Sequence, residues 1–313
     1  MNPQSTLTND QITAIFRTHN LADVPSISRI TIGFTNEVYQ VDSYILKVCV
    51  KKENEPNFRK EEFLYQLLHD KAPLPHVVVA DDSRALLHES YMIYQKLPGE
   101  PAASHWHEMA NTQRKAFIKD LCGYLKIIDN TPQAQYAKQL KVNPSFSWQE
   151  HICDRIAEKL VVIAAQKLLS AENIERINAF IQTNKHVLKE QSLSLAFWDI
   201  HFDNILIDEN YKLSGLLDFE SVDVYPIDYR LMTVRIMQQY PQLYLSEKME
   251  PYAMKEDYAH LMEWYREFYP ELFAFRHIDI RIDFYDLLDI VSKLPEWPKA
   301  QNLHERLAHI LDN

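Results

Sequence analysis

The sequence predicts an α+β protein of two lobes, an N-terminal lobe with a mostly antiparallel sheet and a larger, mainly helical C-terminal lobe. Its 313 residues are more than most single compact cores hold. Short runs of branched and aromatic residues, typical of strands, dominate the first 96 residues. After Gly99 the apolar residues recur mainly at helical spacing. We therefore expect an N-terminal lobe of residues 1–96 and a C-terminal lobe of residues 97–313.

The N-terminal lobe is expected to open with a helix, because Thr8 and Gln11 have the spacing of a capping box. A second helical pattern begins at Pro56 and ends before Pro73, since proline is tolerated in the first turn of a helix but not in its interior. Strand patterns surround these helices. They cover residues 29–34, 38–41, 44–50, 77–80, 85–88 and 91–96.

The C-terminal lobe is expected to be helical on both sides of a short strand-rich segment. Ser147 and Ser170 are suited to cap helices that follow them directly. Between the helices, residues 205–207 and 213–217 have strand patterns joined by a polar turn, which predicts a tight hairpin. The expected helices cover residues 113–128, 148–169, 170–190 and most of the chain after Pro226.

Composition argues against several classes of function. The formal net charge of −11 argues against a nucleic-acid binder, because no lysine–arginine cluster rivals the acidic excess. Three widely spaced cysteines form no disulfide or zinc pattern, which favours a reducing, cytoplasmic compartment. No apolar run approaches the roughly 20 residues that span a bilayer. The four glycines cannot form a Walker A loop or a dinucleotide fingerprint, so any nucleotide site must hold phosphates differently.

The hairpin segment carries oxygen-bearing side chains suited to phosphoryl transfer. Asp199 and Asn204 precede the first strand of the hairpin, and Asp218 ends the second strand. Phosphoryl transfer needs one carboxylate to orient or deprotonate the attacking hydroxyl, and oxygen ligands for Mg²⁺. One carboxylate and one amide are sufficient protein ligands for that metal. The pattern therefore predicts a catalytic carboxylate beside a metal site.

This pattern resembles the catalytic and metal-binding loops of the aminoglycoside phosphotransferase and choline kinase group. The typical catalytic loop of that group is His-Gly-Asp-Leu-His-Pro-x-Asn, and residues 197–204 read Phe-Trp-Asp-Ile-His-Phe-Asp-Asn. The resemblance implies a protein-kinase-like two-lobe fold, ATP or GTP as phosphoryl donor, and Mg²⁺ as cofactor. It implies that Asp199 is the catalytic base and that Asn204 and Asp218 bind the metal.

The N-terminal lobe carries a lysine and a glutamate that match the same family. Lys47 stands in a strand where the phosphate-contacting lysine belongs. Glu61 lies on the following helix and is expected to be its ion-pair partner, with Glu62 as the competing choice.

Two further segments are expected to bind nucleotide through the backbone. Residues 33–39 resemble the Gly-x-Ser-Asn-x-x-Tyr turn of these kinases, which implies that backbone amides at Thr35 and Asn36 cover the phosphates. Residues 91–99 resemble the segment that links the lobes, where the backbone of Gln95 and Leu97 would hydrogen-bond adenine.

Two departures from the family pattern leave an alternative open. Phe197 replaces the first loop histidine, and Glu220 replaces the glycine of Asp-Phe-Gly. The prediction is a phosphotransferase acting on a hydroxyl of a small molecule, and the alternative is a non-catalytic, nucleotide-binding pseudokinase. A protein kinase is disfavoured, because the glycine-rich loop, His-Arg-Asp and Ala-Pro-Glu are absent from the sequence.

The sequence leaves the phosphate acceptor open. His201, Glu220 and Asp223 are candidate acceptor-binding residues. Aspartates at 279, 283, 286 and 289 would share one helix face, which is either solvated or lines the cleft. A cleft-lining face would favour an amine-bearing acceptor such as an aminoglycoside or choline, while homoserine, a methylthio-sugar and a ketosamine stay open. We expect a monomer or homodimer without a nucleic-acid or membrane partner.

Overall fold

The computed structural model describes residues 7–21, 23, 26–30 and 36–312. It divides into two compact units. The first unit contains Met1–Pro101 together with Asn204–Ser221, and the second contains Ala102–Asp203 and Val222–Asn313. The hairpin segment is therefore grouped with the N-terminal sheet, although helical segments flank it in the sequence.

A five-stranded sheet forms the centre of the first unit, in the order β1-β2-β3-β5-β4. Every neighbouring pair is antiparallel, as the sequence predicts. In β2 burial alternates along the strand, because successive side chains point to opposite faces of a sheet. The strands are β1 (Ile27–Ile30), β2 (Glu37–Val41), β3 (Tyr44–Val48), β4 (Val77–Asp81) and β5 (Tyr91–Gln95).

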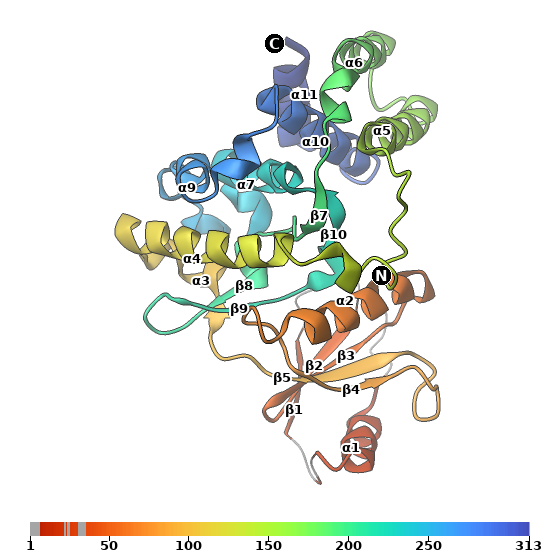
Figure 1. The fold of residues 1–313 in the computed structure, drawn as a ribbon, viewed down its shortest axis with the longest axis vertical. Coiled ribbons are helices and arrows are strands. Elements are labelled where there is room, and N and C mark those ends of the chain that lie inside the picture. The colour runs from red at the N-terminus through yellow and green to blue at the C-terminus, as the bar shows by residue number, and fades with distance from the viewer. Residues whose placement is uncertain (1–6, 22, 24–25, 31–35, 313) are drawn as a thin grey trace. The chain divides into compact units, whose positions relative to one another are not determined.

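Two helices pack beside this sheet (Figure 1). Helix α1 (Asn9–Thr18) begins at the predicted capping box, in which Thr8 and Gln11 each bind the backbone N–H of the other. Its apolar side chains join those of the sheet in one buried cluster. Helix α2 (Glu55–Leu68) begins one residue before Pro56, and its buried residues recur every three or four positions.

The predicted strand at residues 85–88 is wrong. Arg84 has a φ of 60°, in the left-handed region, which interrupts extended backbone. The Arg84 guanidinium donates a hydrogen bond to the carbonyl of His88, so the chain turns back on itself. Leu87 is buried in the sheet cluster, and its apolar side chain had suggested a strand. Of the predicted strand 29–34, residues 31–34 lie outside the described residues.

The predicted hairpin is present in the first unit as β8 (Ile205–Ile207) and β9 (Leu213–Leu216). Strand β6 (Glu100–Pro101) extends it to three strands, in the order β6-β8-β9. Gly99 lies just before β6 with a φ of 104°, and a Cβ there would be 2.4 Å from the carbonyl oxygen of Ile207. Only glycine fits this close approach without a shift of the backbone.

The second unit is mainly helical, as expected, with one two-stranded sheet. Its strands are β7 (Leu193–Ala196) and the antiparallel β10 (Asp223–Pro226). Its helices are α3 (Ala102–His105), α4 (Asn111–Asp129), α5 (Trp148–Ala165), α6 (Ala171–Asn184), α7 (Leu231–Gln239), α8 (Lys255–Tyr258), α9 (Leu261–Phe268), α10 (Ile278–Lys293) and α11 (Gln301–Asp312).

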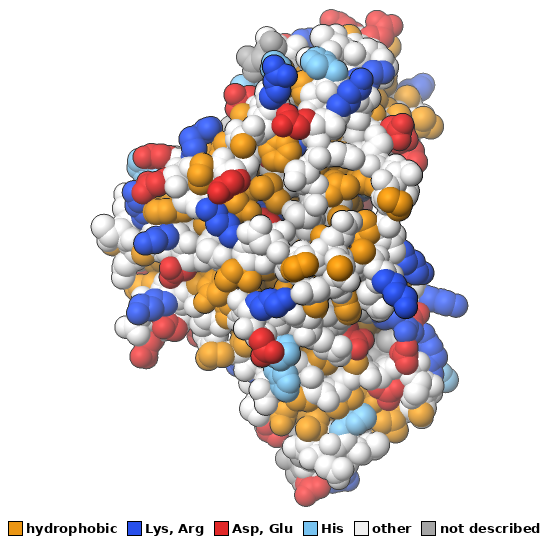
Figure 2. Space-filling view, in the orientation of Figure 1, with side chains coloured by type: hydrophobic (Ala, Val, Ile, Leu, Met, Phe, Trp, Pro, Cys, Tyr) orange, Lys and Arg blue, Asp and Glu red, His pale blue; other side chains and the backbone are white. Residues whose placement is uncertain are grey.

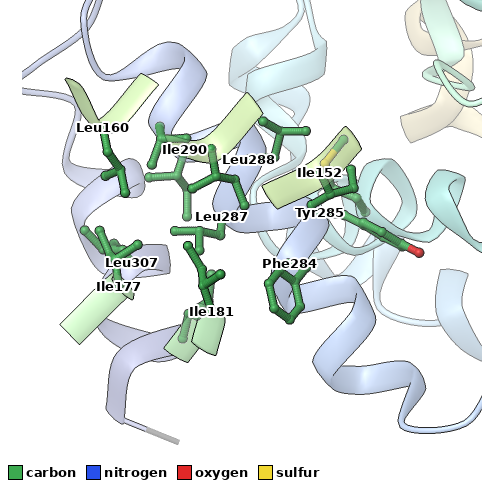
Figure 3. Close-up of a cluster of buried hydrophobic side chains, with 14 of the residues drawn as sticks. Ile152, Leu160, Ile177, Ile181, Phe284, Tyr285, Leu287, Leu288, Ile290 and Leu307 are labelled. Carbon is green, nitrogen blue, oxygen red and sulfur yellow. The ribbon is translucent and has the colours of Figure 1, made fainter. Parts of the chain in front are cut away.

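Helices α5, α6, α10 and α11 meet in a large apolar core (Figure 3). Leu287 and Ile290 of α10 are fully buried and lie among side chains of α5 and α6. Each such side chain contributes roughly 1.5–3 kcal/mol by leaving water. Helix α5 ends four residues earlier than predicted, because Lys167 adopts the left-handed conformation with a φ of 56°.

The surface carries both signs of charge. Figure 2 shows Lys and Arg side chains interspersed with Asp and Glu over the visible face. Within the described part of the chain, no helix combines the length and apolar character that crossing a membrane requires.

Candidate active site

A buried ion pair lies at the centre of the first unit. The Nζ atom of Lys47 on β3 lies 2.5 Å from Oε2 of Glu61 on α2, and both side chains are almost fully buried. Glu62 instead accepts a hydrogen bond from Gln66 along the exposed side of the helix. The structure thus pairs the lysine with Glu61 and not with Glu62, the competing choice.

Two more carboxylates approach the same ammonium group. Oε1 of Glu220 lies 2.8 Å from Lys47 Nζ, and Oδ1 of Asp218 lies 3.5 Å away. Burial alone would lower the pKa of Lys47, but the carboxylates of Glu61, Asp218 and Glu220 outweigh it and hold that pKa well above its usual value. Burial raises the pKa of Glu61 to about 7, with Lys47 opposing the shift. Lys47 is therefore a fixed cation.

Asp218 ends the hairpin in an unusual backbone conformation. Its φ is 60°, in the left-handed region that non-glycine residues rarely adopt. Its backbone N–H donates a hydrogen bond of 3.1 Å to the hydroxyl of Tyr65 on α2. About half of its carboxylate side chain is exposed, in contrast to the buried Glu61. The conformation therefore leaves the Asp218 carboxylate accessible to a ligand.

The hairpin brings the two predicted metal ligands close together. The carbonyl of Asn204 accepts a 2.8 Å hydrogen bond from the N–H of Leu217, the residue before Asp218. Carboxylate oxygens of Glu61, Asp218 and Glu220 all lie within 4.8 Å of one another. Three carboxylates around one ammonium leave excess negative charge, and oxygen donors suit Mg²⁺. The carboxylates of this cluster therefore fit a divalent cation. Metal binding by Asn204 and Asp218 stays a prediction.

Asn36 and Glu220 are joined beside the lysine. The Nδ2 group of Asn36 donates a hydrogen bond to Oε1 of Glu220, the oxygen that also contacts Lys47. Thr35, predicted to help cover the phosphates, lies outside the described residues. The sequence predicts an acceptor-binding role for Glu220, but the structure places its carboxylate against Lys47 in the first unit.

The predicted adenine contacts lie at the end of β5. The backbone N–H of Gln95 donates a 3.0 Å hydrogen bond to the carbonyl of His76. An adenine contact at Gln95 would therefore use its carbonyl oxygen, which can accept from an amino group. Leu97 follows β5 by two residues, and its backbone stays a predicted adenine contact.

Asp199 lies in the second unit, on the loop that follows β7. Its Oδ1 is 3.7 Å from Nε2 of His201, whose ring stacks on Tyr244 at 5.6 Å. Thr233 donates a 3.1 Å hydrogen bond to the carbonyl of Trp198. Phe197 is fully buried, so the loop is held by packing and by Thr233 where the family pattern has a histidine.

The remaining acceptor candidate, Asp223, lies in the same unit as Asp199. It opens β10 directly opposite Ala196, and its Oδ1 accepts a 2.8 Å hydrogen bond from the N–H of Val224. The pairing of β7 with β10 therefore fixes Asp223 near the start of the Asp199 loop. The sequence shows no evident strand pattern for β10.

The acidic face of α10 is neutralised by arginines. Arg235 of α7 binds Asp283 at 2.6 Å and Asp286 at 3.1 Å. Arg306 of α11 binds both Asp286 and Asp289. Three of the four aspartates on this face are thus paired with arginines, and only Asp279 is exposed. The face therefore gives no support to an amine-bearing acceptor.

Two residues of the site were missed by sequence reasoning. Tyr65 lies one turn after Glu61, and this i+4 spacing was the available signal. Thr233 had no signal, because its contact with Trp198 spans 35 positions.

Comparison with solved structures shows that the fold is that of kinase-like phosphotransferases. The streptomycin–ATP complex of APH(2″)-IIa matches with a TM-score of 0.66 and 15% identity, over 100% of this chain and 97% of that chain. ADP-bound aminoglycoside phosphotransferase APH(2″)-Ib matches with a TM-score of 0.67 and 16% identity, over 97% of each chain. Aminoglycoside phosphotransferase APH(4)-Ia matches with a TM-score of 0.69 and 14% identity, over 97% of this chain and 99% of that chain.

The family is shown by the sequence itself. The model of the phosphotransferase enzyme family (APH) matches residues 26–268. The chain belongs to this family, as the resemblance implied. No curated protein sequence matches the chain.

Proposed function

We propose that this chain is an ATP-dependent kinase that transfers the γ-phosphoryl group to a hydroxyl of a small molecule. The observation that carries the proposal is the buried Lys47–Glu61 pair beside Asp218, since kinase-like enzymes need such a lysine and a metal-binding carboxylate together. Membership of the phosphotransferase family supports a kinase-type enzyme.

The nucleotide is assigned to the N-terminal lobe, residues 1–96. Lys47 would bind the α- and β-phosphates, because its ammonium is fixed and protonated. Asn36, with Thr35, would cover the phosphates through the backbone, and the backbone of Gln95 and Leu97 would bind the base. The structures similar to this fold include complexes with ATP, ADP and GDP, which is compatible with either ATP or GTP here.

The catalytic steps are assigned to Asp199 and the hairpin. Asp199 would orient the acceptor hydroxyl and take its proton as the bond to phosphorus forms. Asn204 and Asp218 would hold Mg²⁺, which when bound neutralises charge on the phosphates. Lys47 would stabilise the same charge without moving.

The acceptor is assigned to the C-terminal lobe, residues 97–313. Asp223 and His201 are the proposed acceptor contacts, since both lie in the unit that contains Asp199. The carboxylate of Asp223 favours an amine-bearing acceptor such as an aminoglycoside or choline. The three free cysteines agree with a reducing, cytoplasmic setting, which stays a prediction.

The test is ADP release from ATP and Mg²⁺ over a panel of acceptors. The panel contains aminoglycosides, choline, ethanolamine, homoserine, methylthioribose and ketosamines. Asp199→Asn runs beside the wild type, and Asp279→Asn, an exposed aspartate on α10, is the matched control. We expect one acceptor class to stimulate release, the Asp199 variant to lose it, and the control to keep it.

Two results would count against the proposal. Release that persists in Asp199→Asn would exclude this residue as the base. Tight ATP binding with no stimulated release would support the non-catalytic alternative for this panel.

A further inference from the structure

A closed ring of hydrogen bonds joins α2 to the end of the hairpin. The hydroxyl of Tyr65 donates to Oε1 of Glu61 at 2.8 Å and accepts from the N–H of Asp218 at 3.1 Å. Lys47 closes the ring, because its Nζ binds Oε2 of Glu61 at 2.5 Å and approaches Oδ1 of Asp218 at 3.5 Å. Tyr65 is the only uncharged side chain in this ring.

The Tyr65 side chain is held so that its hydroxyl cannot easily leave the ring. It is 1% exposed, and its ring packs against Phe219 at 5.5 Å and Tyr94 at 6.1 Å. Burial raises the pKa of Tyr65 well above its usual value, so the hydroxyl keeps its proton. The hydroxyl donates its one proton to Glu61 and accepts one hydrogen bond from the Asp218 N–H, so both its donor and its acceptor roles are used.

The two bonds connect different parts of the predicted machinery. Glu61 orients the lysine assigned to the phosphates, and Asp218 is assigned to the metal. The Asp218 backbone is in the left-handed region, which is unfavourable for a residue other than glycine. Such a conformation persists where neighbouring groups fix it, and the Tyr65 hydroxyl is the acceptor that binds this backbone.

We propose that Tyr65 is a positioning residue that couples the lysine–glutamate pair to the metal-binding carboxylate of Asp218. Through its hydroxyl, the placement of α2 sets the direction of the Asp218 carboxylate, so that phosphate binding at Lys47 and metal binding at Asp218 support each other. This inference rests on the proposed kinase function and adds a residue that the family motif does not contain.

The test uses Tyr65→Phe in the full chain, a change that removes only the hydroxyl. Tyr91→Phe is the matched control, because the Tyr91 hydroxyl binds Asp81 at 2.8 Å elsewhere in the same unit. The first measurement is ATP affinity as a function of Mg²⁺ concentration. We expect Tyr65→Phe to raise the half-maximal Mg²⁺ concentration about tenfold, a factor near the upper end of what one neutral hydrogen bond, here the one from the Asp218 N–H, contributes. Without metal, ATP affinity should change less than about twofold, and the control should match the wild type in both conditions.

The second measurement does not depend on the proposed function. Amide hydrogen exchange at Asp218 should become at least about tenfold faster in Tyr65→Phe, since its N–H loses the acceptor, and binding of Mn²⁺ alone should weaken. Unchanged exchange at Asp218 together with an unchanged Mg²⁺ dependence would overturn the role of Tyr65. A purely structural role would lower the unfolding temperature without shifting the Mg²⁺ dependence, and this too would overturn it. Should the wild type bind no ATP, the kinase proposal fails, while exchange and Mn²⁺ binding still decide for or against Tyr65.

Discussion

Replacing Asp228 with alanine should strongly destabilise the second unit. Asp228 lies just after β10 and is fully buried with Arg281 of α10. The arginine binds it through two nitrogens, with Nε at 2.6 Å from Oδ2 and Nη2 at 3.1 Å from Oδ1. The Tyr285 hydroxyl donates a third bond of 2.8 Å to the same carboxylate. The variant would therefore leave an arginine buried without its counter-charge.

The magnitude follows from what remains around the arginine. Removing one partner of a buried pair costs about 3–5 kcal/mol. Arg281 keeps two acceptors, the carbonyls of Val187 at 2.7 Å and Glu190 at 2.9 Å, which places the loss near the lower end, about 3 kcal/mol. In a unit of roughly 200 residues, each kcal/mol lowers Tm by roughly 2–4 °C, so Tm should fall by roughly 6–12 °C.

Thermal unfolding followed by circular dichroism measures this change. Asp279→Ala is the control, because Asp279 is exposed on the same helix and should shift Tm by less than about 2 °C. The double variant Asp228→Ala with Arg281→Met should be more stable than Asp228→Ala alone, since it removes the uncompensated charge. A fall in Tm no larger than that of Asp279→Ala would refute the reasoning.

Three further outcomes are expected. Glu61→Gln should lower kcat/KM about 100-fold in the ADP-release assay, because Glu61 holds Lys47. Glu62→Gln, which changes a residue paired only with Gln66 among the contacts described above, should keep kcat/KM within about twofold of the wild type. Equal losses in the two variants would argue against the pairing of Lys47 with Glu61. Gly99→Ala should lower the free energy of unfolding by about 1–3 kcal/mol, because its Cβ would meet the Ile207 carbonyl. Gly123→Ala should raise the free energy of unfolding by up to about 1 kcal/mol, because a Cβ there has no neighbour among described atoms within 4 Å. Chemical denaturation measures both changes and distinguishes their signs. Chelating divalent cations should abolish ADP release, and added Mg²⁺ should restore it; release that continues in excess chelator would contradict a metal site at Asn204 and Asp218.

Local patterns predicted the elements whose determinants are close in sequence. The capping box of α1, the proline at the start of α2 and the hairpin turn of β8 and β9 each depend on residues within a few positions. The choice between Glu61 and Glu62 required the structure, because both lie on α2 and differ only in which face is buried. The strand predicted at 85–88 failed for a similar reason, since an apolar residue such as Leu87 can be buried from a loop.

Contacts that span long stretches of sequence were not predictable. Strand β10 forms because it pairs with β7, with Asp223 opposite Ala196 and Pro226 opposite Leu193. A four-residue run carries too little pattern to reveal this pairing. The aspartates of α10 share a face as expected, but their arginine partners come from other helices. A sequence shows the charges on one helix and not those that another helix brings against them.

The discontinuity of the first unit has a consequence for how the protein is made. Its sheet is contained in Met1–Pro101, but its hairpin, with Asn204 and Asp218, arrives only with Asn204–Ser221. A ribosome adds about 5–20 residues per second, so the roughly 120 residues from Pro101 to Ser221 take about 6–24 s. During that interval the carbonyl of Pro73 lacks the hydrogen bond that it accepts from the N–H of Leu216 in the complete chain. A nascent or truncated chain that ends before Asn204 would therefore contain Lys47 and Glu61 but neither of the proposed metal ligands. On the proposed function, its capacity to bind a metal–nucleotide complex should appear late in synthesis.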